Sequence, residues 1–474
     1  MLKKWAFWVL VGLVSTVAVA DGPDDFVWRT LRIDYVHTGT ATDEQFALRR
    51  IRVEGEWPGS RTQLLDSTNL GKYRIEVVDH GSQRLLYSRG FASIYGEWET
   101  TGEARSGQWR AFEEAVRIPE PRAPFQLRIR KRDATMSFQE VWSLDVDPTS
   151  RFVDRPERQP EDAAGVRVVL DNGAPANHVD LVILGDGYTD DDAERFKSDV
   201  QQATDALFSV EPFRSRKSDF NVRSVFTPAT QRGISRPRAG VFRDTPLGAR
   251  YNSFDSERYM LTLDDRRWRD VAAAVPYDFV LILAPERKYG GGGIFRLYST
   301  AASGSSYFDY LVIHEFGHHF AGLADEYYTS DVAYDEFVPA SVEPWEANVT
   351  ALLDPAALKW GERVDAATPL PTPWPKERYE EASHASQERR RMLRSQGAAE
   401  DVLEGLFDDE RELFTSMLEE HEFSRKVGAF EGAMYEARGL YRPTADCIMF
   451  TRDEVGFCPV CSDAITRVID MYSN

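Results

Sequence analysis

Histidine is scarce in this chain, with 8 copies among 474 residues, and long hydrophobic runs are missing beyond the first twenty residues. A helix that crosses a bilayer needs about 20 consecutive apolar residues, so the sequence excludes stable membrane insertion beyond its start. Positive charge is also in short supply, because 57 lysines and arginines face 77 aspartates and glutamates. The formal net charge of -20 argues against nucleic acid or an anionic membrane as a partner.

Cysteine is scarcer still, and its three copies, Cys447, Cys458 and Cys461, are confined to the C-terminal region. In an oxidising compartment we expect two of these thiols to form a disulfide that braces the C-terminus, with one left over. A zinc site built from cysteine alone is disfavoured, because a fourth thiol is missing.

The first 20 residues have the composition of a secretory signal peptide. Lys3 and Lys4 give a short basic start, residues 5–17 are almost wholly apolar, and Ala18-Val-Ala20 matches a small-residue cleavage site. The alternative is an uncleaved anchor, which this cleavage pattern disfavours. We therefore expect an exported protein that works in the periplasm or outside the cell.

Hydrophobic periodicity divides the rest of the chain into unlike parts. Over residues 21–150 apolar residues alternate with polar ones, as in Leu31-Arg-Ile-Asp-Tyr35, which predicts the antiparallel strands of a β-sandwich-like domain. Residues 151–165 are rich in proline and charge, as linkers are. Residues 166–474 mix apolar strand runs, such as Val179–Leu184, with amphipathic helices, so we expect an α/β domain with a mainly parallel sheet.

Two shorter segments of this second part also carry predictions. Residues 376–426 place apolar residues at helical spacings among many charges, which predicts a helical insertion. The acidic turn Gly185-Asp186-Gly187 could bind calcium, but we favour a role in capping the helix that follows it. That helix is expected to begin after Thr189.

Three of the eight histidines lie in one short stretch, His314-Glu-Phe-Gly-His318-His319. His314 and His318 are four residues apart, so on a helix both imidazoles project from one face toward a shared metal ion. Zinc prefers neutral imidazole nitrogen, and Glu315 is placed to act as general base on a water activated by that ion. His319 points to another face of the helix and is predicted to be structural.

The third ligand is predicted from the glycine that ends this helix. Asp325 follows Gly322 by three residues, which is the step between glycine and third ligand in the metzincin pattern H-E-x-x-H-x-x-G-x-x-H. The glycine comes one position late, and Ala324 occupies the place of the metzincin ligand. We therefore predict one catalytic Zn²⁺ bound by His314, His318 and Asp325, with Glu326 as the alternative to Asp325.

Further downstream, Met449 could lie beneath the metal as the methionine of the metzincin Met-turn does, although Thr451 stands where a tyrosine is usual. An oxyanion would then need another donor. The candidates are Tyr327, Tyr328, Tyr435 and Tyr441.

A glycine-rich stretch, Gly290–Gly293, precedes the alternating sequence Ile294-Phe295-Arg-Leu297-Tyr298. It lacks the lysine and hydroxyl of a phosphate-binding loop. We interpret it as a mobile loop that leads into an edge strand, and our hypothesis is that Ile294, Phe295 and Leu297 belong to a strand that pairs with extended substrate above the zinc.

Together these stretches resemble the M64 family of secreted zinc metallopeptidases, which is named for immunoglobulin A peptidase. The resemblance implies a zinc endopeptidase with His314 and His318 as ligands and Glu315 as acid and base, acting on immunoglobulin-type or other extracellular proteins. The segment before residue 150 is similar to the N-terminal domain of that family. The matching stretches are Leu184–Thr189, Tyr289–Gly293, His314–Tyr327, Lys359–Trp360, Gly428–Ala433, Tyr441–Pro443 and Cys447–Met449.

The predicted fold class is therefore α+β or α/β in several domains, with a metzincin-like zinc peptidase domain after the N-terminal one. Two other functions stay open: a non-catalytic binding or adhesion protein on a peptidase-like fold, and a hydrolase of cell-wall peptides. A protein that only binds has no evident need for the acid at Glu315 between two ligands.

Overall fold

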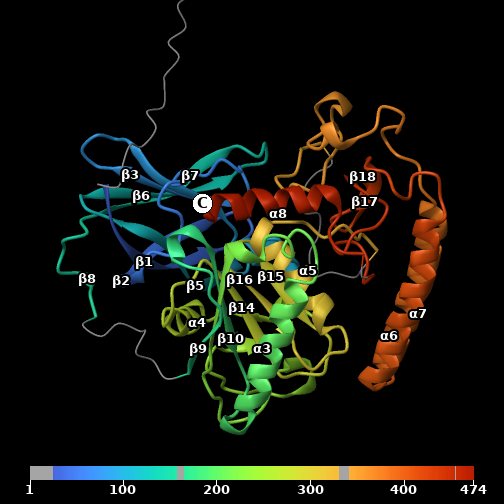
Figure 1. Cartoon of the computed structure of the whole chain (residues 1–474), viewed down its shortest axis with the longest axis horizontal. Helices are drawn as coiled ribbons and strands as arrows, with labels where there is room; N and C mark the ends of the chain where they lie inside the picture. The colour runs from blue at the N-terminus through green and yellow to red at the C-terminus, as the bar shows by residue number, and fades with distance from the viewer. Residues whose placement is uncertain (1–24, 157–164, 330–340, 454, 474) are drawn as a thin grey trace, which may run out of the picture.

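The computed structural model describes residues 25–156, 165–329, 341–453 and 455–473. The predicted signal peptide and the middle of the predicted linker lie outside the described residues. The architecture is mixed α+β, with antiparallel sheets first in the chain and a larger domain after them (Figure 1). Across the described ranges, none of the helices combines the length and apolar character that crossing a bilayer requires.

Two four-stranded sheets make up the N-terminal part. Their strands are β1 (Phe26–Gly39), β2 (Glu44–Glu56), β3 (Tyr73–Asp79), β4 (Leu85–Phe91), β5 (Arg110–Pro121), β6 (Phe125–Arg132), β7 (Phe138–Val146) and β8 (Val153–Asp154). The sheet orders are β5-β1-β2-β8 and β4-β3-β6-β7, and all pairs are antiparallel except that of β2 with the short β8. Leu31, Ile33 and Tyr35 of β1 share one core with Ile75 and Val77 of β3. The predicted alternation is confirmed, because one face of each strand enters this core.

A six-stranded mixed sheet forms the centre of the larger domain. Its strands are β9 (Val166–Leu170), β10 (Val179–Gly185), β11 (Phe220–Val225), β14 (Phe279–Ala284), β15 (Gly291–Ile294) and β16 (Tyr298–Ala302). In the order β15-β16-β14-β10-β11-β9, the four inner strands are parallel and the two outer ones antiparallel to their neighbours. The predicted mainly parallel sheet is confirmed. Leu181 and Ile183 of β10 enter one core, and Val182 and Leu184 enter another, so the sheet is covered on both faces.

Helices cover the central sheet and form a hairpin at one side of the molecule (Figure 1). They are α1 (Ile94–Trp98), α2 (Gly102–Arg105), α3 (Ala193–Leu207), α4 (Asp265–Ala272), α5 (Phe308–Ala321), α6 (Lys376–Ser395), α7 (Glu400–Glu419) and α8 (Pro459–Tyr472). Helix α3 packs on α5 and buries an apolar face that includes Phe196 and Val200. Helices α6 and α7 form the hairpin, and both lie within the segment 376–426 that was predicted to be helical.

Two small hairpins complete the larger domain. Their strands are β12 (Ala249–Arg250), β13 (Leu261–Thr262), β17 (Phe430–Ala433) and β18 (Glu436–Arg442). The second hairpin lies beside one end of α8, whose other end reaches the N-terminal sheets (Figure 1). Helix α8 also packs against α5, so it connects three parts of the molecule.

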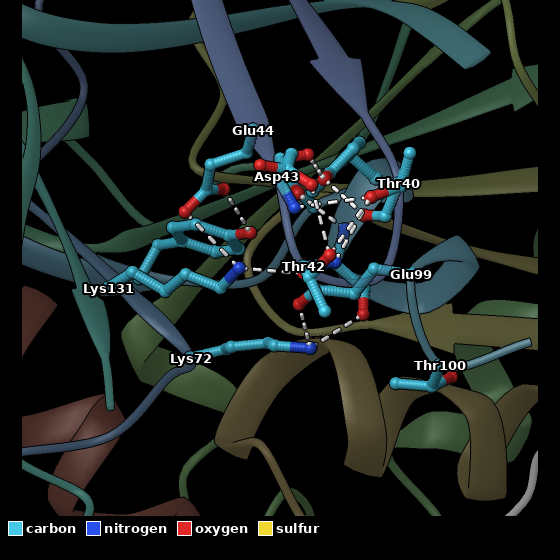
Figure 2. Close-up of polar contacts among 12 residues, drawn as sticks. Thr40, Thr42, Asp43, Glu44, Lys72, Glu99, Thr100 and Lys131 are labelled. Atoms are coloured by element: carbon cyan, nitrogen blue, oxygen red, sulfur yellow. Dashed lines mark hydrogen bonds and ion pairs between the residues drawn. The ribbon is translucent and has the colours of Figure 1, made fainter. Parts of the chain in front are cut away.

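A group of charged side chains fastens α1 to the N-terminal sheets (Figure 2). The Nζ atom of Lys131 on β6 lies 3.2 Å from Oε1 of Glu44 and 2.7 Å from Oε2 of Glu99, which directly follows α1. Lys72 also pairs with Glu99, and its Nζ donates to the carbonyl of Gly96 at 2.8 Å. One carboxylate therefore holds two lysines, and this network fixes the position of α1 over the sheet.

The predicted role of Asp186 is wrong. Its carboxylate accepts hydrogen bonds from the backbone N–H groups of Leu247 at 3.0 Å and Ala249 at 2.8 Å and from the hydroxyl of Thr245 at 2.7 Å. The acceptor sites of Asp186 thus brace a distant loop instead of capping a helix. Capping falls to Thr189, which forms a capping box with Asp192 ahead of α3.

The predicted disulfide is not formed. All three cysteines are buried free thiols, and the Sγ atoms of Cys447 and Cys461 are 3.9 Å apart, whereas a disulfide bond is about 2.05 Å long. The expectation rested on an oxidising compartment alone and took no account of what else the thiols could contact.

Candidate active site

Helix α5 carries His314 and His318, and a glycine sets its end. The backbone φ of Gly322 is 61°, and a Cβ atom there would lie 2.8 Å from the ring of Trp345 and 3.1 Å from that of Phe295. A larger residue would be strained at this φ and would lack space, so glycine ends the helix as predicted. The chain then turns and brings residues 323–328 back beside the two histidines.

Three of the predicted ligand side chains converge on one point. The Nε2 atoms of His314 and His318 are 3.2 Å apart, and each lies 3.1 Å from Oδ1 of Asp325. Ligands about 2.0–2.1 Å from a tetrahedral zinc ion are separated by roughly 3.3 Å. A carboxylate oxygen of Glu315 lies within 4.8 Å of both imidazole nitrogens. The arrangement therefore has the dimensions of a metal site with an acid beside it.

Each converging side chain is oriented by a second contact. Nδ1 of His314 lies 2.9 Å from the carbonyl oxygen of Ile448 and 3.1 Å from the hydroxyl of Tyr310, and Nδ1 of His318 lies 2.6 Å from the carbonyl oxygen of Leu323. With a proton on each Nδ1, both Nε2 atoms present lone pairs to the centre. The hydroxyl of Tyr435 donates to Oδ2 of Asp325. Contacts of this kind fix the tautomer and rotamer of metal-binding side chains.

Glu326, the alternative third ligand, faces away from the histidines. Its Oε1 atom accepts from Asn348 at 3.0 Å and lies 3.3 Å from Sγ of Cys461. The structure therefore brings Asp325, and not Glu326, to the histidine pair. His319 also faces away, because its Nε2 accepts from the N–H of Val280 and its Nδ1 donates to the carbonyl of Ile294, both at 3.0 Å. Burial lowers the pKa of His319 to about 3, so this histidine stays neutral and connects α5 to two strands.

Burial and the neighbouring charged groups shift the pKa values of the side chains in the site. Burial raises the pKa of Glu315 above its ordinary value, which makes it a stronger proton acceptor near neutral pH. Burial alone would lower the pKa of His318, but the carboxylate of Asp325 outweighs it and raises that pKa to about 9 in the metal-free chain. Burial would raise the pKa of Asp325, but the two histidines hold it well below its ordinary range. A cation between these groups would take the place of the extra proton that the carboxylate favours on His318.

The site opens into a pocket of about 170 Å³ that both parts of the chain line. Ala92 and Glu97 come from the N-terminal part, and Arg258 and Glu346 come from the larger domain. Burial raises the pKa of Glu346 to about 7. These residues stand outside any recognisable motif, so sequence reasoning missed them. The N-terminal part thus contributes to a wall of the pocket.

The four tyrosine candidates separate into two groups. Tyr327 and Tyr435 line the pocket, and their hydroxyls are 3.4 Å apart. Nη2 of Arg258 donates to the hydroxyl of Tyr327 at 2.8 Å, so a positive charge stands behind this pair. Tyr328 instead packs against the rings of Trp374 and Tyr379, outside the pocket lining. Tyr441 belongs to β18, where its backbone bonds to that of Thr350.

The predicted edge strand over residues 294–298 is wrong in its position. The edge strand is β15, and residues 295–297 form the turn that joins it to β16. Arg296 has a positive φ of 55°, and the carbonyl of Phe295 accepts from the N–H of Ala92 at 3.0 Å. Phe295 and Leu297 are buried in the core shared with the N-terminal part, so their alternation reflects packing. Phe295 also lines the pocket.

Met449 lies beneath α5 and is fully buried. Its sulfur would be 3.1 Å from a Cβ atom at Gly317, the residue that directly precedes His318 on the helix. The carbonyl of Met449 accepts the N–H of Glu326 at 2.8 Å. The segment around Met449 therefore supports both the helix and the loop that carries Asp325.

Comparison with known families gives two matches that together span most of the chain. A family model described as IgA Peptidase M64 matches residues 168–469. A second model, described as Peptidase M64 N-terminus, matches residues 23–143. Comparison with curated proteins gives no match.

Proposed function

The chain belongs to the M64 peptidase family, and from this premise we propose that it is an exported zinc-dependent endopeptidase. The family makes it a peptidase that acts on protein or peptide substrates. Zinc, the internal position of the cut and export are parts of the proposal. The observation that carries it is the convergence of His314, His318 and Asp325 within 3.1–3.2 Å of one another beside Glu315.

The donor set suits zinc. Two neutral imidazole nitrogens and one carboxylate oxygen are ligands that catalytic zinc ions take, with a fourth position left for water or substrate. Nδ1 of each histidine already faces a carbonyl oxygen, which leaves Nε2 free to bind. When bound, the ion would lower the pKa of water toward neutrality and polarise the carbonyl to be cut.

In this mechanism Glu315 moves the proton. It accepts one proton from the attacking water and returns it to the amide nitrogen of the leaving peptide. Its carboxylate lies beside β15, with Oε1 3.0 Å and Cγ 2.9 Å from where a Cβ would stand at Gly291. The strand thus confines the acid on one side, and the histidine pair confines it on the other.

Tyr435, with Tyr327 and Arg258 behind it, would stabilise the oxyanion. Burial raises the pKa of Tyr435, so its hydroxyl keeps its proton. Its one hydrogen, which the carboxylate of Asp325 accepts in this structure, would turn to the oxyanion as negative charge develops there. Arg258 adds a positive charge that reaches the hydroxyl of Tyr327. We also propose that Met449 plays the part of a Met-turn in a metzincin-like domain, and that residues 376–426 are an insertion beside the cleft.

The test uses the mature protein and its Glu315→Gln variant, which keeps the shape of the side chain and removes the base. Both are incubated with an unfolded protein, with immunoglobulin A and with purified cell wall, and their zinc content is measured in parallel. We expect protein fragments from the parent only, at equal zinc content. Removing the metal with a chelator should stop cleavage, and added zinc should restore it.

The other outcomes separate the remaining functions. Equal cleavage by parent and variant would refute Glu315 as the base. Release of peptides from cell wall, with proteins left intact, would favour a cell-wall hydrolase. If neither form cleaves anything although zinc is bound, a binding role on a peptidase fold would replace the proposal.

A further inference from the structure

Three cysteines and a glutamate form a second cluster of metal-ligating side chains, separate from the histidine site. Ligand atoms of Glu326, Cys447, Cys458 and Cys461 all lie within 4.8 Å of one another. Sγ of Cys461 is 3.9 Å from Sγ of Cys447 and 3.3 Å from Oε1 of Glu326. Cys458 is 6% exposed, and the other three have no exposed surface. The cluster is thus a closed group of four ligands, which is the number that structural zinc sites use.

The spacing between these atoms fits a tetrahedral ion. Four ligands with zinc–sulfur bonds of about 2.3 Å place neighbouring sulfurs roughly 3.8 Å apart. The measured separation of Cys447 and Cys461 matches that value and is nearly twice the length of a disulfide bond. Zinc also accepts carboxylate oxygen, so Glu326 supplies the fourth ligand that the cysteines lack.

The carboxylate of Glu326 is the second indication of an ion. Among the described residues, its Oε2 atom has no hydrogen-bond partner although the side chain is wholly buried. A buried carboxylate with an unsatisfied oxygen is costly unless a cation or a donor pairs with it. The three thiols beside it are weak donors. A divalent cation among these four side chains would satisfy all of them.

The backbone around the cysteines is arranged to hold thiolates. Cys458 is the N-cap of α8, and the sequence Cys458-Pro-Val-Cys461 places both sulfurs at the positive end of a helix of 14 residues. The N–H of Cys461 points to Sγ of Cys458 at 3.5 Å, and the N–H of Cys458 points to Sγ of Cys447 at 3.4 Å. Donors of this kind partly offset the negative charge of thiolates around an ion.

We propose that Glu326, Cys447, Cys458 and Cys461 bind a structural zinc ion. Thiolate ligands favour zinc over magnesium or calcium, and four protein ligands leave no open position for catalysis. The proposal stands on these four side chains and does not depend on peptidase activity.

This ion would tie together the segments that support the histidine site. Glu326 directly follows Asp325, and Cys447 directly precedes Ile448, whose carbonyl oxygen contacts Nδ1 of His314 at 2.9 Å. Cys458 and Cys461 belong to the start of α8, which packs against α5. One structural ion would therefore fix both the loop that carries Asp325 and the carbonyl that orients His314.

The experiment measures zinc per chain and the spectrum of the cobalt-substituted protein. We expect two zinc ions in the full chain, one in His318→Ala and one in Cys461→Ser. Cobalt bound to thiolates gives a charge-transfer band in the near ultraviolet that a site of imidazole and carboxylate lacks. The band should therefore persist in His318→Ala and disappear in Cys461→Ser. Ser462→Ala, one position further along α8, is the matched control and should keep two ions and the band.

Two results would overturn the proposal. One is a His318→Ala variant that holds no zinc and whose cobalt form lacks the thiolate band. The other is an intact mass two hydrogens lower than the free-thiol mass, which would show a disulfide in the cluster. Both results come from forms with all three cysteines, so they decide the question even if Cys461→Ser does not fold. Loss of peptidase activity alone would bear on the histidine site and not on this one.

Discussion

Breaking the ion pair between Arg296 and Asp66 is expected to cost about 3–5 kcal/mol of unfolding free energy, because both charges are buried. Nη1 of Arg296 lies 3.0 Å from Oδ2 of Asp66, and the side chains are 7% and 2% exposed. Arg296 sits in the turn next to Phe295, and Asp66 belongs to the N-terminal part, where it also accepts the N–H of Gly90 at 2.8 Å. The pair thus joins the turn that contains Phe295, a residue of the pocket lining, to the N-terminal part.

The perturbation is Arg296→Met, which keeps an unbranched, flexible side chain of the aliphatic kind and leaves the carboxylate of Asp66 without this cation. The double variant Arg296→Met with Asp66→Asn removes both charges, so it should lose less than the sum of the single variants by about 1–3 kcal/mol. Denaturant unfolding at constant pH measures the stability of Arg296→Met, of Asp66→Asn and of the double variant. The matched control is Arg287→Met, which breaks an exposed pair with Asp401 and should change stability little.

The pH dependence of this effect has a definite sign. Burial alone would raise the pKa of Asp66, but Arg296 and Arg89 outweigh it and hold the pKa well below its ordinary value. The stabilisation is therefore present above the unfolded pKa of about 3.9 and is lost as the pH falls through the lower folded value. Strictly additive single variants, or a loss equal to that of the exposed control, would refute the reasoning.

Three further predictions concern the site and the N-terminal part. Tyr435→Phe removes the hydroxyl that contacts Asp325 and should weaken metal affinity or turnover about 10–100-fold. Titration with a chelator measures the metal affinity, and kcat of the metal-loaded variant measures the turnover. Gly293→Ala places a Cβ 2.2 Å from a backbone oxygen of α5, so strand and helix must separate, and turnover should fall on the order of 10²-fold with the zinc content reduced. Burial alone would lower the pKa of His37, but Glu114 outweighs it and raises that pKa. The stabilisation of the fold by protonated His37 is therefore complete below about pH 6.5 and declines as the pH rises through the folded-state pKa. Denaturant unfolding at increasing pH should show the difference in stability between the parent and His37→Gln becoming smaller.

Much of the fold could be predicted, because its signals are local. The alternation around Ile33 and the apolar run of Val179–Leu184 each show within a few residues which side chains are buried. The spacing of His314 and His318 predicts that they share one face as soon as the segment is helical. Alternation failed at Phe295 and Leu297, because a turn that inserts two side chains into a core shows the same pattern as a strand.

The rest of the site depends on contacts between distant segments. Asp325 and Glu326 are chemically equivalent candidates in the sequence, and only the folded chain turns one toward the histidines and the other toward the cysteines. Tyr435 is 110 residues from Asp325. Glu326 is 135 residues from Cys461, which is why three thiols alone looked one ligand short. Arg258 has no motif at all and joins the site through the packing of its loop.

The carbonyl of Ile448 lies 134 residues after His314 in the chain, yet it orients that imidazole. During synthesis both histidines are therefore made well before the group that aims one of them. The N-terminal part is synthesised first, and α5 with the two histidines follows it. The segment around Ile448 and helix α8 are synthesised last. A chain that is still being synthesised lacks the carbonyl that orients His314. Its active site is therefore not yet assembled, and it does not yet cleave the proteins around it.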